Sequence, residues 1–253
     1  LQLPEETIDS FIDGVTYIME EGYHTYLDVH LMMLLPNAPI NEPGYKDQFG
    51  IESVDAQPRF SHRSNPEKLV DDLVSFVIAT RKCTHEEWIK GHQFRWLVIF
   101  GHYLGPLQFI ARALKKIKNV SYKEFYTTLL MHCETSSNAF IHKEYKNILN
   151  NLTLILKNKR HWGDVIKGCG NINWEVDEAT CIRISKDRDI FYTDMKNYIK
   201  NIYKLDNKLL DCIIDYQKAR LHGPNIQYPI KQNFEYNIHD VIEKNAKLEK
   251  KQN

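Results

Sequence analysis

The chain has 253 residues, and its 33 basic and 33 acidic side chains give a formal net charge of zero. This balance gives no overall field that would attract nucleic acid or an anionic membrane, and we expect neither as a partner. A composition of 43% hydrophobic and 26% charged residues is typical of a globular protein with a core. The five cysteines are widely spaced and form no CxxC pair, which predicts reduced thiols in a cytoplasmic protein and no metal site built from them alone.

The chain begins with a helical pattern followed by an extended one. Residues 7–21 place apolar side chains at helical spacing, and Gly22 ends the pattern. Residues 26–35 predict a strand that ends at Pro36, with one uniformly apolar face. Asp28 and His30 share the other face, which we expect to line the interior of an α/β barrel. The start is neither a Met nor a signal peptide, which suggests a beginning inside a domain.

A change of period near residue 84 divides the chain into two predicted parts. Before it come a loop over 37–62, with a short helix near Tyr45, and a second strand over 73–79. After it the pattern is helical throughout. Two strands do not make a stable sheet, so we expect sheet neighbours from outside this sequence. The predicted helices cover residues 85–103, 106–118, 122–134, 137–157, 175–185, 188–204 and 207–221.

The predicted fold class is therefore α+β and mostly α. Residues 1–83 are expected to form a partial α/β barrel segment, and residues 84–253 an all-α helical C-terminal domain. The best candidate for a membrane span is the segment 96–114, but His102, Gln108 and Arg112 interrupt it, and we expect no span.

Several short motifs occur together in the order found in one enzyme family. Residues 3–11, LPEETIDSF, are similar to the GLPGET turn of radical SAM barrels, although Gln2 and Glu5 stand where that turn has glycine. Residues 34–39, LLPNAP, resemble the end of a later barrel strand in cobalamin-binding members. Residues 77–88 resemble a strand-to-helix step of the same enzymes, and residues 101–109 resemble their helical hairpin. Further matches in the helical region are Trp162-Gly163, Trp174-Glu175, Glu178-Ala179, Phe191-Tyr192 and Tyr216-Gln217.

The chain thus resembles the C-terminal part of a cobalamin-binding radical SAM enzyme, here with a radical SAM barrel segment at 1–83. The resemblance implies that the full-length protein uses S-adenosylmethionine, a [4Fe-4S] cluster and cobalamin. It implies cleavage of S-adenosylmethionine for methyl transfer or related radical chemistry on a small-molecule substrate. The missing N-terminal half would hold the cobalamin domain and the CxxxCxxC loop, so we expect this chain alone to bind none of these cofactors and to be inactive.

Three groups of residues are candidates for chemistry. Asp28 and His30 are the catalytic candidates, because a carboxylate can fix the tautomer of a histidine that shuttles a proton. The turns that match the family motifs are candidates for cofactor binding, namely Pro4, Glu6, Thr7, Pro36 and Asn37. One face of the helix after residue 84 is a candidate substrate pocket, formed by His92, Arg95, Trp96 and Tyr103.

Each of these groups also has a purely structural interpretation. Asp28 and His30 can be a hydrogen-bonded polar pair, residues 36–39 a stiff turn, and the helix face part of the core. For the whole chain, the alternative function is a helical binding or assembly module that docks a partner chain without catalysis. An upstream CxxxCxxC in the same reading frame would favour the enzyme over this alternative.

Overall fold

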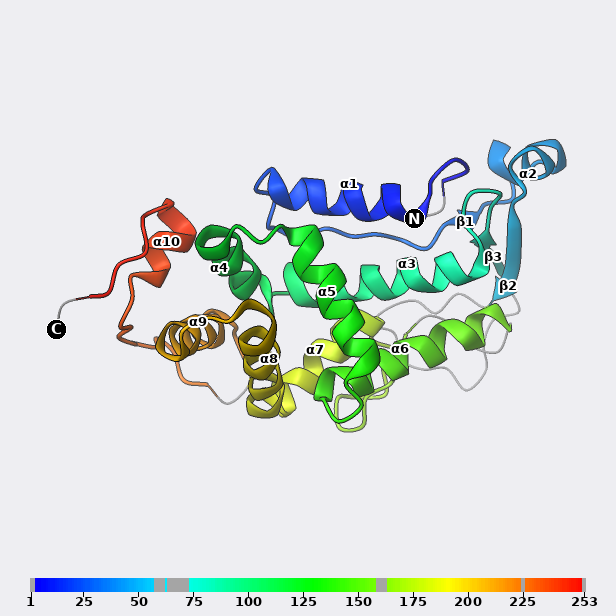
Figure 1. Ribbon diagram of the computed structural model, residues 1–253. Coiled ribbons are helices and arrows are strands. Elements are labelled where there is room, and N and C mark those ends of the chain that lie inside the picture. The colour runs from blue at the N-terminus through cyan, green and yellow to red at the C-terminus, as the bar shows by residue number, and fades with distance from the viewer. Residues whose placement is uncertain (1–2, 57–61, 63–72, 158–162, 224–225, 252–253) are drawn as a thin grey trace.

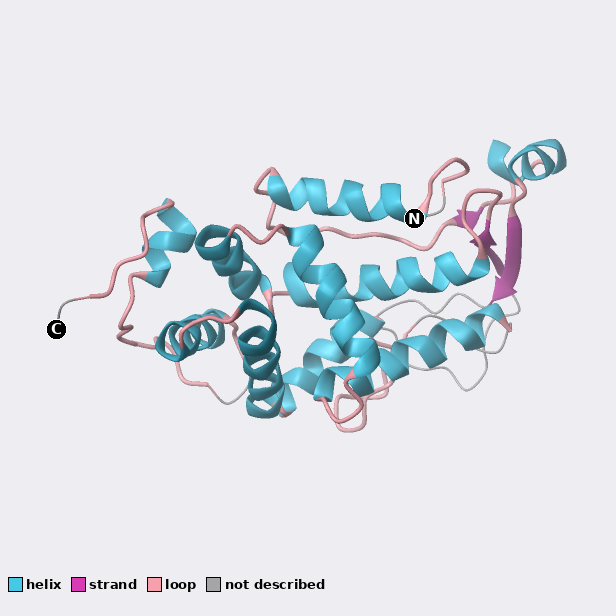
Figure 2. Cartoon of the chain, viewed as in Figure 1, coloured by secondary structure: helices cyan, strands magenta, loops and turns pink. Residues whose placement is uncertain are grey.

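The computed structural model describes residues 3–56, 62, 73–157, 163–223 and 226–251. Parts of the predicted motifs, loop and strand region lie outside this description, namely Gln2, residues 57–61, residues 69–72 and Trp162. The described part is mostly helical and carries one small sheet, which confirms the α+β, mostly α class (Figures 1 and 2). The sheet lies at one end of the molecule, and the C-terminal helices α9 and α10 lie at the other.

The helices begin and end close to the predicted positions, and capping side chains mark several of the starts. Helix α1 begins after Thr7, whose side chain caps the amide of Ser10, and α3 begins after Thr84, which forms a capping box with Glu87. A π-helical turn, η2, continues α3 directly. The bounds are α1 Ile8–Glu20, α2 Pro43–Phe49, α3 His85–Val98, η2 Ile99–Tyr103, α4 Gln108–Lys118, α5 Tyr122–Thr135, α6 Phe140–Leu156, α7 Val176–Lys186, α8 Arg188–Tyr203, α9 Asn207–Arg220 and α10 Ile238–Lys244, with a 3-10 turn, η1, at Pro39–Asn41.

The sheet has three strands in the order β1-β3-β2, and both pairings are antiparallel. They are β1 Met33–Leu34, β2 Glu52–Ala56 and β3 Val74–Ala79. The sequence predicted β3 but not β2, whose residues ESVDA contain only one large apolar side chain, Val54. Among the described residues the strands form no parallel pair, so a radical SAM barrel is not seen.

The predicted strand over 26–35 is wrong for most of its length. Only Met33 and Leu34 pair with β3, and residues 24–32 form an extended segment that runs along α1 and α3 (Figure 1). Leu27, Val29 and Leu31 pack against the core, as their shared face requires. An extended segment becomes a strand only when another strand pairs with it, and within the described chain no strand pairs with residues 26–31.

One continuous core joins α1, β3 and the helices from α3 to α10. Phe11, Val15 and Met19 of α1 belong to the same buried cluster as the helices that follow, so α1 packs onto α3 and α5. Helix α3 is the centre of this core, because nearly its whole second half is buried. The division at residue 83 remains a prediction, since the core crosses it.

Among the described helices, none is by itself long and apolar enough to cross a membrane. The bent pair of His85–Tyr103 and Gln108–Lys118 reaches that length and apolarity only when its two parts are taken together, across an 88° bend.

Candidate functional site

Arg95 of α3 lies between the extended segment and α7. Its Nη1 donates to Oδ2 of Asp177 at 2.8 Å, and its Nε donates to the backbone oxygen of Val29. Its Nη2 lies 3.7 Å from Oδ1 of Asp28. The Arg95 side chain is only 6% exposed and that of Asp177 only 3%, so the contact between these two charges is shielded from water. Arg95 thereby ties the extended segment to the helical core.

Asp28 is the point at which three side chains meet. Its Oδ2 accepts a hydrogen bond from the hydroxyl of Tyr26 at 3.2 Å and lies 3.3 Å from Nε2 of His30. Arg95 approaches its other oxygen. The Asp28 side chain is 34% exposed and that of His30 is 79% exposed, so the pair faces outward from the described chain. The expectation that both residues line the interior of a barrel is therefore not met here, because no barrel wall covers this face.

The geometry nevertheless suits one kind of chemistry. A carboxylate held by an arginine and a tyrosine can orient the imidazole beside it, and an accessible imidazole can pass a proton to or from a ligand. The structure thus brings three predicted site residues together, Asp28, His30 and Arg95, although they were assigned to two different groups.

Asp177 adds a buried acid that the sequence did not single out. It lies in the first turn of α7, and burial raises its pKa to about 6, against the opposing charge of Arg95. Its second oxygen, Oδ1, is buried without a hydrogen-bond partner in the described chain. Neighbouring Glu178 accepts from Nε2 of His62 at 2.7 Å. The acidic first turn of α7 was visible in the sequence, but its contact with Arg95 joins residues 82 positions apart.

The remaining candidates on α3 are packed inside the protein. His92 is fully buried against Trp88, and Nε1 of Trp96 donates to Oγ1 of Thr180 at 3.0 Å. Tyr103 is buried beside His102. These positions match the structural interpretation of the face, and a substrate role for them remains a prediction.

The candidate cofactor residues lie at two separate turns. Pro4, Glu6 and Thr7 precede α1, where Thr7 is occupied in capping the helix. Pro36 and Asn37 follow β1 and are exposed. Nothing in the described structure brings these two turns onto one ligand, and their role also remains a prediction.

The described residues do not fit an iron–sulfur cluster. All five cysteines are free, and they lie in different parts of the fold. Burial raises the pKa of Cys83 to about 11 and that of Cys133 and Cys181 still further, which disfavours the thiolate that a metal requires. No group of three His, Cys, Asp or Glu side chains among the described residues could hold a metal ion.

Comparison with known proteins places the chain in context. It is 24% identical over 257 residues to the cobalamin-dependent radical SAM methyltransferase TokK of Streptomyces tokunonensis, a match that covers 95% of this chain and 37% of that protein. The chain is a relative of cobalamin-binding radical SAM enzymes.

A second relative of this chain is named as a methyltransferase too. It is the 2-(S-pantetheinyl)-carbapenam-3-carboxylate methyltransferase of Streptantibioticus cattleyicolor, which is 23% identical over 211 residues, or 79% of this chain and 31% of that protein. The chain thus spans about a third of the length of these curated relatives. No family model matches it.

Proposed function

We propose that this chain is the C-terminal part of a radical SAM methyltransferase, in which it completes the barrel and covers it with helices. The observation that carries the proposal is the similarity to a cobalamin-dependent radical SAM methyltransferase over 95% of the chain. S-adenosylmethionine, a [4Fe-4S] cluster and cobalamin would be the cofactors. The cluster and the cobalamin would be held by sequence outside residues 1–253, since the cysteines described here do not fit a cluster.

The extended segment supports the structural half of this proposal. Within the described chain, the backbone groups of residues 26–31 pair with no strand, although the apolar face of the segment is already packed on the core. A neighbouring barrel strand would satisfy these groups. Closure of the barrel through such strands would place Asp28 and His30 on its inner face.

In this arrangement Asp28 and His30 serve the substrate and not the cofactors. Arg95 and Tyr26 fix Asp28, and Asp28 orients His30, which would exchange a proton with the substrate or hold one of its polar groups. Arg95 is a positioning residue, because it acts through Asp28. The free cysteines agree with a cytoplasmic, reducing environment.

The test is anaerobic reconstitution of the full-length protein with iron, sulfide, cobalamin and S-adenosylmethionine. We expect 5′-deoxyadenosine and transfer of a methyl group, with the pantetheinyl carbapenam named for the second relative as the first substrate to try. If neither product forms from a protein that has bound its cluster, the enzymatic proposal fails. A protein that is inactive but retains a partner chain would be the binding module considered above.

The role of the pair is tested separately in the same assay. His30→Gln is expected to lower methyl transfer about 100-fold or more, while iron content and cobalamin binding stay unchanged. The matched control is His85→Gln, because His85 is also an exposed histidine beside a carboxylate, 3.1 Å from Glu52. Equal activity of the two variants would remove His30 from the proposed site.

A further inference from the structure

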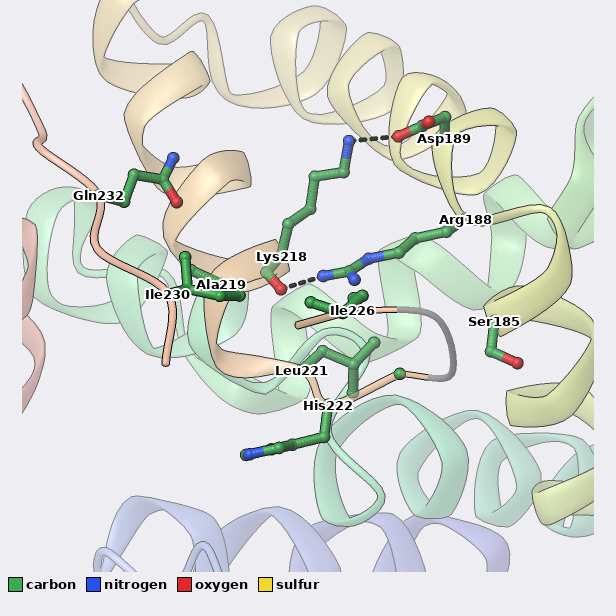
Figure 3. A pocket seen from close by; sticks show the side chains of 11 residues that line it. Ser185, Arg188, Asp189, Lys218, Ala219, Leu221, His222, Ile226, Ile230 and Gln232 are labelled. Atoms are coloured by element: carbon green, nitrogen blue, oxygen red, sulfur yellow. Dashed lines mark hydrogen bonds and ion pairs between the residues drawn. The ribbon is translucent and has the colours of Figure 1, made fainter. Parts of the chain in front are cut away.

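A cavity separate from the candidate site lies between helices α8 and α9. Its volume is about 340 Å³, within the size range of pockets that hold small molecules. It opens where α7 ends, α8 begins and α9 ends (Figure 3). The residues predicted from the sequence as site residues do not line it. One wall is apolar, formed by Leu221, Ile226 and Ile230, and the other carries charged side chains.

The charged wall has an excess of positive charge. Lys218 forms an ion pair with Asp189, so these two charges compensate each other. Arg188 donates from Nη2 to the backbone oxygen of Lys218, but in the part of the chain that the structure describes no carboxylate pairs with it (Figure 3). Its Nε is buried and has no hydrogen-bond partner there. The carboxylate of Asp189 also attracts Arg188, but it is already paired with Lys218. The half-buried guanidinium is therefore only partly compensated, and an anion lowers the cost of burying it.

The start of α8 adds to this attraction. Arg188 is the first residue of a helix of 16 residues, and no side chain caps its first turn. The uncapped backbone N–H groups of that turn and the helix dipole favour negative charge near the start of α8.

The backbone also leaves room next to this guanidinium. A Cβ atom at Gly223 would stand 3.8 Å from Nη1 of Arg188 and 3.3 Å from Cδ1 of Ile226. Glycine at this position thus keeps space between the cation and the apolar wall. His222 stacks on Tyr228 at the edge of the cavity, with ring centroids 4.8 Å apart.

From these features we infer that the cavity between α8 and α9 binds a small organic anion. Its carboxylate or phosphate group lies against Arg188 and the first turn of α8, and its apolar body lies against Leu221 and Ile230. The inference does not depend on the proposed enzymatic function, because the cavity shares no residue with the Asp28 site.

The experiment is isothermal titration of the purified chain with phenyl phosphate, phenylacetate and the neutral benzyl alcohol. We expect at least one of the two anions to bind tenfold or more tightly than the alcohol, and the stronger of them identifies the anionic group. Equal binding of all three, or no binding of either anion, overturns the inference.

Three variants locate the binding. Arg188→Met should weaken the anion at least tenfold, and Arg188→Lys should weaken it less, because lysine keeps the charge but loses the planar fork. Ile230→Ala should weaken phenyl phosphate but not inorganic phosphate. Lys200→Met is the matched control, since Lys200 is exposed near the other end of α8.

Thermal melting of each variant shows whether it remains folded. Unchanged binding in a folded Arg188→Met or Arg188→Lys protein would contradict the site. Should Arg188→Met fail to fold, Arg188→Lys and Ile230→Ala still decide the matter.

Discussion

The helical region and the extended segment before it are held by different forces. Helices α3 to α9 share one core, in which α3 is buried on nearly every side over its second half. The segment over residues 24–32 has one face on that core, while its outer face carries Tyr26, Asp28 and His30 toward solvent. Arg95 supplies one polar connection between the two, and His24 at the start of the segment supplies another. The helices bury their apolar faces against one another, whereas the backbone edges of the segment over residues 26–31 pair with no strand in the described chain.

We expect the largest loss of folding stability from a substitution inside the helical core. Phe100 is fully buried in η2, with its ring 4.7 Å from that of Trp96. Phe100→Ala should lower the free energy of unfolding by about 3–5 kcal/mol, because it leaves a cavity among rigid neighbours. Denaturant unfolding measures the change. Met131→Ala, at an exposed position of α5, is the control, and equal losses would contradict a continuous core at η2.

A somewhat smaller loss of stability is expected when the contacts of Arg95 between the two regions are removed. Arg95→Met removes the partner of Asp177, and the buried acid is then uncompensated, which should cost about 3 kcal/mol of stability. Combining Arg95→Met with Asp177→Leu should recover most of this loss. The combined variant must still release the extended segment, seen as faster amide exchange at residues 26–31. Unchanged exchange there would assign the connection to apolar packing alone.

The ionisation of Asp177 gives a pH signature of the same connection. Its pKa is raised from 3.8 to about 6, so the folded state binds this proton more tightly than the unfolded state. The stability it contributes is complete below pH 4 and is lost as the pH rises through 6, by at most about 3 kcal/mol, since each pKa unit corresponds to about 1.4 kcal/mol. Asp177→Asn should remove this slope from unfolding curves recorded between pH 4 and 7. An identical slope in the variant would show that Asp177 is ionised throughout.

His24, which lies where the extended segment begins, is expected to give the opposite dependence of stability on pH. Its Nδ1 is 3.0 Å from Nε2 of the buried His102, and burial lowers the pKa of His24 to about 4. The unfolded state then binds the proton more tightly, so stability is lost as the pH falls from 6.5 toward 4. His24→Gln should flatten the stability profile in that range by a smaller amount than Asp177→Asn, since His24 is half exposed. A steeper profile would contradict this.

We expect the smallest loss of stability from removing the cap at the start of α3. Thr84→Ala removes a capping box and should cost about 1 kcal/mol, without changing the extended segment. Thr7→Ala at the start of α1 is its companion, because it has the same type of cap. If Thr84→Ala cost as much as Phe100→Ala, the stability of the helical region would depend on its ends and not on its core.

The sequence predictions are accurate for the helical region and less accurate for the extended segment. The predicted helix over 137–157 is confirmed as α6, because apolar periodicity alone defines a buried helix face. That face consists of Ile141, Tyr145, Ile148, Leu152 and Ile155, and all five are buried. The strand over 26–35 was not found beyond Met33 and Leu34, because a strand depends on a neighbour that periodicity cannot supply. Helix α10 was missed within the charged and irregular C-terminal part.

The candidate site was predictable only in part, for a related reason. Asp28 and His30 lie two residues apart, so a shared face is enough to pair them. The roles of Arg95 and Asp177 depend on tertiary contacts across 66 and 82 residues, which local pattern does not encode. The cavity at Arg188 combines the ends of three helices and left no local signal either.

We propose that the extended segment over residues 26–31 becomes a barrel strand when a further strand pairs with its backbone. Hydrogen–deuterium exchange at the amides of residues 26–31 tests it most directly, in this chain alone and in the full-length protein. We expect exchange that is at least 100-fold slower in the full-length protein, because a paired strand protects its backbone. Equal exchange in both proteins would contradict it.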